Sequence, residues 1–145
     1  MRKIDKLIVH CSATPEHKDF DVEDITEWHV KGNGWSDCGY HYVIKLDGEI
    51  QEARPIEKSG AHVAGVNKRS IGICYIGGMD KNMENWIDTR TPEQKESLIN
   101  ILQDLKQEFP DAIIYGHRDF TDKKPCPSFD AKNEYLEISN YKSNE

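Results

Sequence analysis

The segment 91–109 carries the strongest local pattern in the chain. Thr91 and Gln94 are three residues apart, the spacing of a capping box, and Pro92 occupies the first helical position, where proline is favoured. A long helix with one apolar face needs a surface to cover, so this segment predicts a sheet elsewhere in the chain. Pro110 ends the predicted helix. Its apolar face is formed by residues at helical spacing: Leu98, Ile101, Leu102, Leu105 and Phe109.

Four short apolar regions predict the strands of that sheet. Each contains aliphatic or β-branched residues and ends at a turn or loop, as buried strands do. One region is split by Asp47 and Gly48, a dipeptide that favours a tight hairpin turn. Behind Asp21, apolar residues recur at helical spacing, which predicts a short helix. The expected strands are residues 6–11, the hairpin strands 39–45 and 49–51, the central strand 70–76, and residues 112–115.

The chain length sets the number of domains. With 145 residues there is room for one domain, because domains average roughly 100–200 residues. Strands mixed with helices predict an α/β fold, a single domain with a central mixed β-sheet flanked by helices. We expect this domain to span residues 1–138, and residues 139–145 to form a flexible C-terminal tail.

Charge and apolar content exclude several classes of protein. The chain has 19 basic and 26 acidic residues, and the net charge of −7 disfavours a nucleic-acid partner. The apolar runs are far shorter than the ~18 residues of a membrane-spanning helix, so we expect no membrane insertion. The charged N-terminus is not followed by the apolar stretch of a secretory signal, which predicts synthesis in the cytoplasm without a signal peptide. The four cysteines include no C-x-x-C pair, and we expect them to be reduced.

Two of the six histidines lie where predicted strands end. His10 falls near the end of the first apolar run and His117 follows the last, and strand ends are where α/β proteins build their sites. Cys126 lies nine residues after His117, between two prolines, and a rigid loop of that length can return to the strand end that it left. Two His and one Cys match the protein ligands of a catalytic zinc ion, which would activate water for amide or ester hydrolysis. On spacing alone, strand-end histidines with other partners and a buried thiol are an equally good interpretation.

Lys124 and Tyr40 are candidates for the chemistry beside such a metal. Lys124 lies two residues before Cys126, where an ammonium group would stabilise negative charge on a tetrahedral intermediate. Tyr40 begins the predicted hairpin strand, where we expect it to share a face with Tyr42 while His41 takes the other face. Its phenol could orient the nucleophile or stabilise an oxyanion. A solvated lysine and a half-buried aromatic residue are the commoner interpretations of such positions.

Several sequence blocks occur in an order that resembles a known family. The blocks are 9–14 (VHCSAT), 34–44 (GWSDCGYHYVI), 60–62 (GAH) with Asn67, 70–73 (SIGI), 116–119 (GHRD) and 124–130 (KPCPSFD). Together they resemble the type 2 N-acetylmuramoyl-L-alanine amidases, a zinc amidase family that includes phage lysozymes and is related to peptidoglycan recognition proteins. The match covers residues 6–130, and several ordered blocks are far more specific than a single motif.

The resemblance implies a fold, a metal and a reaction. It implies a mixed sheet flanked by helices, with one zinc ion per chain at the rim of a peptidoglycan groove. The reaction would be hydrolysis of the amide bond between the lactyl group of N-acetylmuramic acid and L-alanine of the stem peptide. Residue by residue, the family's metal ligands fall on His10, His117 and Cys126, its catalytic tyrosine on Tyr40, its loop lysine on Lys124, and groove contacts on His62, Asn67 and Arg54.

Two other functions fit the same residues. A recognition module would hold a muropeptide without cutting it, although recognition proteins that do not cut typically replace the cysteine ligand. A cysteine hydrolase would use Cys126 as nucleophile with His10 or His117 as base. Chelation separates the amidase from the thiol enzyme, because removal of metal abolishes only the amidase.

The resemblance also bears on partners and location. We expect a monomer that acts on peptidoglycan or muropeptides of the cell wall, as a phage or prophage endolysin, after release or holin-type export. Some phage members of the family also bind and inhibit an RNA polymerase, and no motif in this chain indicates or excludes that partner.

Overall fold

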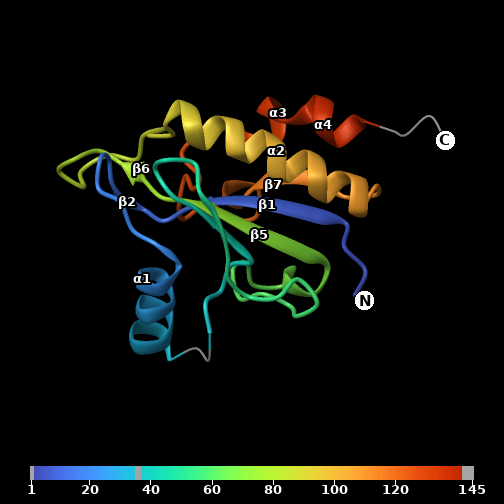
Figure 1. Ribbon diagram of the computed structural model, residues 1–145, viewed down its shortest axis with the longest axis horizontal. Coiled ribbons are helices and arrows are strands. Elements are labelled where there is room, and N and C mark those ends of the chain that lie inside the picture. Colours follow the sequence, from blue (N-terminus) through green and yellow to red (C-terminus); the bar gives the residue numbers. More distant parts are fainter. Residues whose placement is uncertain (1, 35–36, 142–145) are drawn as a thin grey trace.

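A five-stranded mixed sheet organises the protein, in a computed structural model that describes residues 2–34 and 37–141 (Figure 1). The inner strands run parallel to one another, and the hairpin adds one antiparallel strand at an edge. The carboxyl ends of the parallel strands therefore meet at one side of the sheet. In spatial order the strands are β4 (Ile50–Glu52), β3 (Tyr42–Ile44), β5 (Ser70–Tyr75), β1 (Lys6–Cys11) and β7 (Ile113–Gly116); a separate pair joins β2 (Thr14–Pro15) to β6 (Gly78–Met79).

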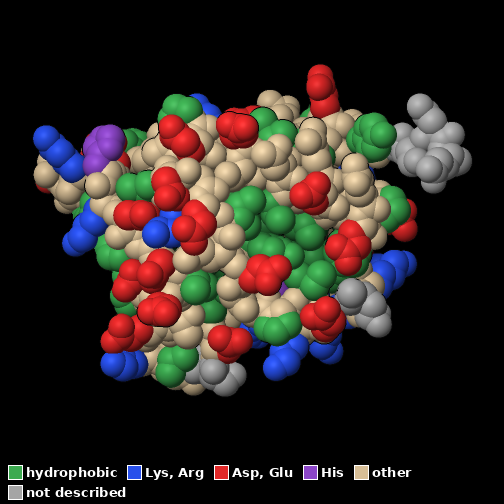
Figure 2. Space-filling model, viewed as in Figure 1, with side chains coloured by type: hydrophobic (Ala, Val, Ile, Leu, Met, Phe, Trp, Pro, Cys, Tyr) green, Lys and Arg blue, Asp and Glu red, His purple; other side chains and the backbone are tan. Residues whose placement is uncertain are grey.

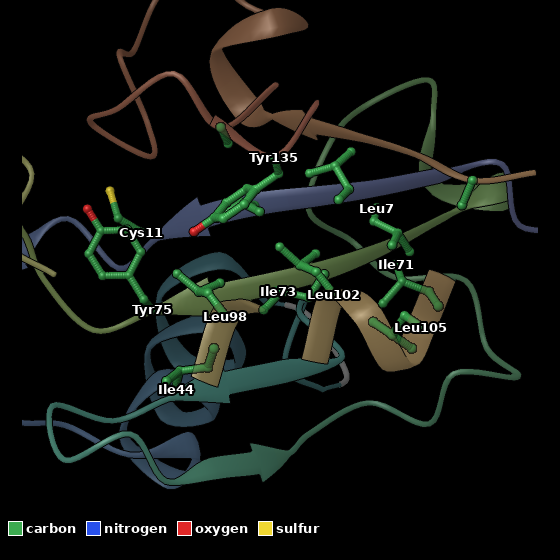
Figure 3. Close-up of a cluster of buried hydrophobic side chains, with 14 of the residues drawn as sticks. Leu7, Cys11, Ile44, Ile71, Ile73, Tyr75, Leu98, Leu102, Leu105 and Tyr135 are labelled. Atoms are coloured by element: carbon green, nitrogen blue, oxygen red, sulfur yellow. The ribbon is translucent and has the colours of Figure 1, made fainter. Parts of the chain in front are cut away.

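One face of the sheet carries the larger hydrophobic core. Side chains alternate along a strand, so every second residue of β1 and β5 points to this face. They pack against the apolar side of α2 (Pro92–Glu108), which lies across the strands in Figure 1. Figure 3 shows this cluster, whose buried members include Leu7, Val9, Cys11, Ile71, Ile73, Tyr75, Leu98, Leu102 and Leu105.

The opposite face is smaller. Val43, Cys74 and Ile76 pack there with Ile25 of α1 (Val22–Glu27). Asp21 begins this helix through a capping box with Asp24, and the helix continues into a π-helical turn, Trp28–Gly32. His10 alternates with Val9 and Cys11, so its side chain belongs to this second face.

The helices explain how the sheet is covered. The capping box predicted for α2 is present, since Thr91 Oγ1 accepts from the Gln94 N–H at 3.1 Å and Gln94 Oε1 accepts from the Thr91 N–H at 3.0 Å. Two short helices, α3 (Ala131–Glu134) and α4 (Leu136–Asn140), contact β7. They protect the outer strand of the sheet, whose edge would otherwise be open to pairing.

The sheet, the hairpin and the two expected helices confirm the predicted α/β fold, but the start of the hairpin differs. β3 begins at Tyr42, and residues 39–41 precede it in irregular backbone. Strand alternation therefore fails before Tyr42. Tyr42 packs against the α2 core whereas Tyr40 packs against the cluster of the opposite face, so the expectation that they share a face is wrong.

The C-terminal boundary also differs from the expected one. Residues 139–145 are expected to form a flexible tail, but α4 continues to Asn140. Ser139 is buried, and its hydroxyl oxygen accepts a hydrogen bond from the Ile114 N–H at 2.9 Å. Residue 139 is thus part of the domain, while residues 142–145 lie outside the described residues.

The surface charge and the state of the cysteines follow the expectations from the sequence. Acidic side chains are scattered over the face that carries α2 (Figure 2), in line with the net charge. All four cysteines are buried free thiols. Within residues 2–34 and 37–141, no helix combines the length and the apolar character needed to cross a membrane.

Candidate metal and catalytic site

Three side chains converge at the carboxyl end of the parallel strands. His10 lies near the end of β1, His117 follows β7 at the start of a 3-10 turn (His117–Asp119), and Cys126 lies in the loop beyond it. One ligand atom from each residue lies within 4.8 Å of the other two. The ring centroids of His10 and His117 are 4.7 Å apart. The structure therefore brings together the three residues predicted to hold a metal.

Hydrogen bonds hold the loop that carries Cys126 against the sheet. The Arg118 N–H donates to the Cys126 carbonyl at 2.7 Å, which folds the loop back onto its own start. The hydroxyl of Tyr75, in β5, donates to the Pro127 carbonyl at 2.6 Å. The return of this loop to the strand end, predicted from its length, is confirmed.

Burial and charge keep both histidines neutral. His10 is only 1% exposed. Burial lowers the pKa of His10 well below its usual value, and His62, His117 and Lys124 lower it further. Burial and then Lys124 also lower the pKa of His117. Neutral imidazole is the form that ligates a metal, so both rings are ready to do so at neutral pH.

Cys126 is a buried thiol rather than an activated nucleophile. Contact with the Cys11 side chain, followed by burial, raises the pKa of Cys126 well above its usual value. A buried thiol that stays protonated is unreactive, which argues against the cysteine-hydrolase interpretation. A bound cation would favour the thiolate, and the Cys11 N–H, which points at Cys126 Sγ from 3.2 Å, would stabilise it. The donor set therefore fits zinc, for which two His and one Cys are suitable ligands.

Tyr40 lies against His10 on the second face of the sheet. The ring centroids of Tyr40 and His10 are 5.0 Å apart, and those of Tyr40 and His29 are 5.4 Å apart. Nδ1 of His29 accepts from the Gly39 N–H at 2.8 Å, which fixes the backbone next to Tyr40. Burial, followed by the surrounding cysteines, raises the pKa of the Tyr40 phenol well above its usual value. The phenol is protonated at all working pH values and can donate a hydrogen bond.

Lys124 and an open cleft complete the site. Lys124 is exposed, and its ammonium lies close enough to lower the pKa of both His10 and His117. A cleft of about 730 Å³ adjoins His117. Its walls come from the loop after β7 and from residues 63–64: Val63, Ala64, His117, Arg118, Asp119, Phe120, Thr121, Asp122 and Lys123.

The three residues expected to contact substrate form hydrogen bonds or close polar contacts within the protein. The Arg54 guanidinium donates to the Cys38 carbonyl at 2.9 Å and to the Ser59 carbonyl at 2.7 Å. Asn67 Oδ1 accepts from the N–H groups of two residues in its own loop, His62 and Val63. His62 Nδ1 lies 2.8 Å from His10 Nε2. None of the three lines the cleft beside His117, and their contact with substrate stays a prediction.

Comparisons with known proteins identify the family. Residues 1–129 match the family model described as N-acetylmuramoyl-L-alanine amidase. The chain belongs to this family. It is 41% identical over 125 residues to an endolysin of Enterobacteria phage K11, covering 86% of this chain and 81% of the endolysin. The solved structure of the N-acetylmuramoyl-L-alanine amidase LysC from Clostridium intestinale is also similar, with a TM-score of 0.75 and 31% identity over 94% of this chain and 83% of that one.

A recognition protein is also similar, since the chain is 32% identical to the peptidoglycan-recognition protein SC2 of Drosophila melanogaster. That match covers 84% of this chain and 64% of the recognition protein. The phage endolysin is the more similar of the two. The protein is an N-acetylmuramoyl-L-alanine amidase, an amide hydrolase of the endolysin type.

Some residues around the candidate site carry little or no signal in the sequence. His29, which supports Tyr40, carries no motif of its own, and nothing in the chain separates it from the other histidines. Arg118, Phe120 and Thr121 line the cleft, and their only signal is their place in the polar loop that follows His117. This loop lies between two predicted ligands, and loops on a rigid scaffold carry many binding residues.

Proposed function

We propose that the amidase depends on one zinc ion held by His10, His117 and Cys126, and that it cleaves peptidoglycan after release from the cytoplasm in which it is made. The observation that carries the proposal is the meeting of these three ligand atoms within 4.8 Å of one another, at the end of the parallel strands. Neutral histidines and a cysteine beside a backbone N–H support a metal with three protein ligands and one open position.

Zinc at this position would supply Lewis-acid chemistry, since it polarises a carbonyl oxygen and makes water acidic enough to attack at neutral pH. The residues of the chain bind and orient the substrate. His10 and Cys126 are buried, whereas His117 adjoins the cleft, so this set of residues is accessible from the side of His117. The scissile amide between the lactyl group and L-alanine would enter from that cleft.

Tyr40 and Lys124 stabilise the charge that develops on the amide oxygen. The protonated phenol of Tyr40, packed against His10, donates a hydrogen bond to this oxygen. The ammonium of Lys124 adds positive charge from the exposed side. Groups aimed at developing charge in a partly buried site act strongly, and loss of one such donor typically costs about 100-fold to 1,000-fold in rate.

The test uses mass spectrometry of a muramoyl-peptide incubated with the purified protein as isolated, with a chelator, and with zinc restored. We expect a peptide with a free L-alanine N-terminus, absent with chelator and regained with zinc. Turnover that survives complete removal of metal would contradict the zinc proposal. An intact muramoyl-peptide in the presence of stoichiometric zinc would favour a recognition module instead.

A further inference from the structure

His62 forms a chain of polar contacts that ends at a proposed metal ligand. Its Nδ1 lies 2.8 Å from Nε2 of His10, and the two rings meet edge to face with centroids 4.9 Å apart. Its other ring nitrogen, Nε2, lies 3.2 Å from the hydroxyl oxygen of Ser70. Both ring nitrogens of His62 are therefore used by the protein itself.

The surrounding backbone is shaped to hold this ring. A Cβ atom at Gly72 would lie 2.8 Å from Cγ of His62, and one at Gly60 would lie 2.7 Å from its Cδ2. Real side chains almost never come so close, so both glycines are needed for the ring to lie where it does. Asn67 Oδ1 fixes the backbone of the same segment, because it accepts from the N–H groups of His62 at 3.0 Å and Val63 at 2.9 Å.

Metal ligation by His10 selects one of the two arrangements of protons that these contacts allow. A neutral imidazole has one N–H donor and one acceptor nitrogen. If His10 donates from Nε2 to His62, its Nδ1 carries the lone pair that a metal requires. His62 then accepts at Nδ1 and carries its own proton on Nε2, from which it donates to Ser70. The three residues satisfy one another without a charged group.

We infer that His62 is a positioning residue for the metal ligand His10, rather than a substrate contact. This inference rests on the proposed zinc site. His62 fixes the tautomer and the ring orientation of His10, and in this arrangement the Ser70 hydroxyl oxygen accepts from Nε2 of His62. Metal-ligating histidines usually donate their second ring N–H to such a partner, which raises the basicity of the ligand and preorganises it.

The decisive measurement is zinc affinity, obtained by competition with a chelating indicator, for wild type and the variants His62→Leu and His62→Asn. We expect His62→Leu to weaken zinc binding by about 10-fold to 100-fold, the range found for such partners of metal ligands. The asparagine Oδ1 can take the place of Nδ1 as acceptor, so His62→Asn should recover most of the affinity. His17→Asn, at a histidine whose side chain is 87% exposed, is the control and should bind zinc as wild type does.

A second readout is the visible spectrum of the cobalt-substituted protein, which reports the ligand geometry around the ion. We expect His62→Leu to change this spectrum, and Ser70→Ala to weaken zinc binding in the same direction by a smaller factor. Ser70→Ala removes a single hydroxyl, so it tests the inference even if His62→Leu fails to fold.

Three results would overturn the inference. Wild-type zinc affinity in both His62→Leu and Ser70→Ala would show that the contact does not position His10. A raised KM for the muramoyl-peptide at unchanged zinc affinity would return His62 to the role of substrate contact. A wild-type protein that binds no zinc would overturn the proposed metal site itself, which separates that failure from the first two.

Discussion

The two faces of β1 bury different chemistry. Toward α2, Leu7, Val9 and Cys11 pack among aliphatic side chains that form the larger core (Figure 3). Toward the other face, His10 contacts the rings of three further residues, and each contact is polar or aromatic: they are His62, His117 and Tyr40.

The two faces of this strand therefore contribute differently: one stabilises the fold and the other carries the polar groups of the candidate site. On the face that packs against α2, apolar side chains are removed from water, and this burial is the main favourable contribution to folding. The second face holds polar groups whose hydrogen bonds must all be satisfied, because an unpaired buried polar group is costly. Among the described residues that are not exposed, no buried side-chain nitrogen or oxygen lacks a hydrogen-bond partner. Substitutions on the two faces should therefore have separable effects.

His117→Ala should have the largest effect on activity. It removes one of three proposed ligands, so we expect loss of stoichiometric zinc and a fall in turnover of more than about 100-fold, beyond the loss seen for partners of ligands. The unfolding midpoint of the metal-free protein should change little, because His117 is only half-buried. Zinc content by elemental analysis and turnover of a muramoyl-peptide measure both effects. A His117→Ala protein that keeps its zinc but loses activity would contradict the ligand role.

Leu102→Ala should show the reverse pattern. Leu102 is fully buried between α2 and the sheet, so its truncation should lower the free energy of unfolding by about 2–5 kcal/mol. Zinc affinity and turnover at a temperature where the variant is folded should match the wild type. Urea unfolding and metal competition test this directly, and a large loss of zinc affinity would show that the two faces are coupled.

The sequence predicted the α2 face almost completely. The Thr91–Gln94 capping box and the helical spacing of apolar residues are local patterns, and local patterns are what a sequence displays. The meeting of the three proposed ligands could also be predicted, since strand ends and the ordered blocks place His10, His117 and Cys126 at one edge. The end of α4 was missed because Ser139 is held by a hydrogen bond to β7, far from it in the chain.

The contacts that surround His10 on the second face of the sheet could not be predicted from the spacing of residues in the sequence. His62 reaches His10 across 52 positions of sequence, through space that exists only because Gly60 and Gly72 lack side chains. Tyr40 was placed on the wrong side of the sheet relative to Tyr42, because alternation was extended into backbone that is not strand. Neither the contact between His62 and His10 nor the irregular backbone before Tyr42 is recorded in a local period of the sequence.

Tyr40→Phe sharpens the comparison by removing one oxygen. Without the phenol hydroxyl we expect turnover to fall by about 100-fold, or about 2.7 kcal/mol of transition-state stabilisation, with zinc still bound. Tyr42→Phe is the matched control, because Tyr42 packs on the α2 face, and its turnover should be that of the wild type. Equal turnover in the two variants would remove Tyr40 from the mechanism.

His41→Asn should produce the smallest effect, a change in how stability depends on pH. His41 is buried, and its ring centroid lies 5.9 Å from that of His62. Nδ1 of His41 accepts from the Gly72 N–H at 3.0 Å. The pKa of His41 is lowered to about 4, mainly by burial. The hydrogen bond to the Lys58 carbonyl raises this pKa, whereas the charges of Arg2 and Arg54 lower it.

Between an unfolded-state pKa of about 6.5 and the folded value, the unfolded chain binds a proton at this position that the folded protein does not. Stability is therefore present above about pH 6.5 and is lost as the pH falls toward 4. Asparagine can still accept from Gly72 but does not titrate, so His41→Asn should lessen the slope by up to about one proton, or about 1.4 kcal/mol per pH unit. Urea unfolding of the metal-free protein from pH 7 to pH 4.5 measures the slope, with His17→Asn as the exposed control. Parallel pH profiles for wild type and His41→Asn would mean that His41 is not held neutral, and that this part of the second face tolerates charge.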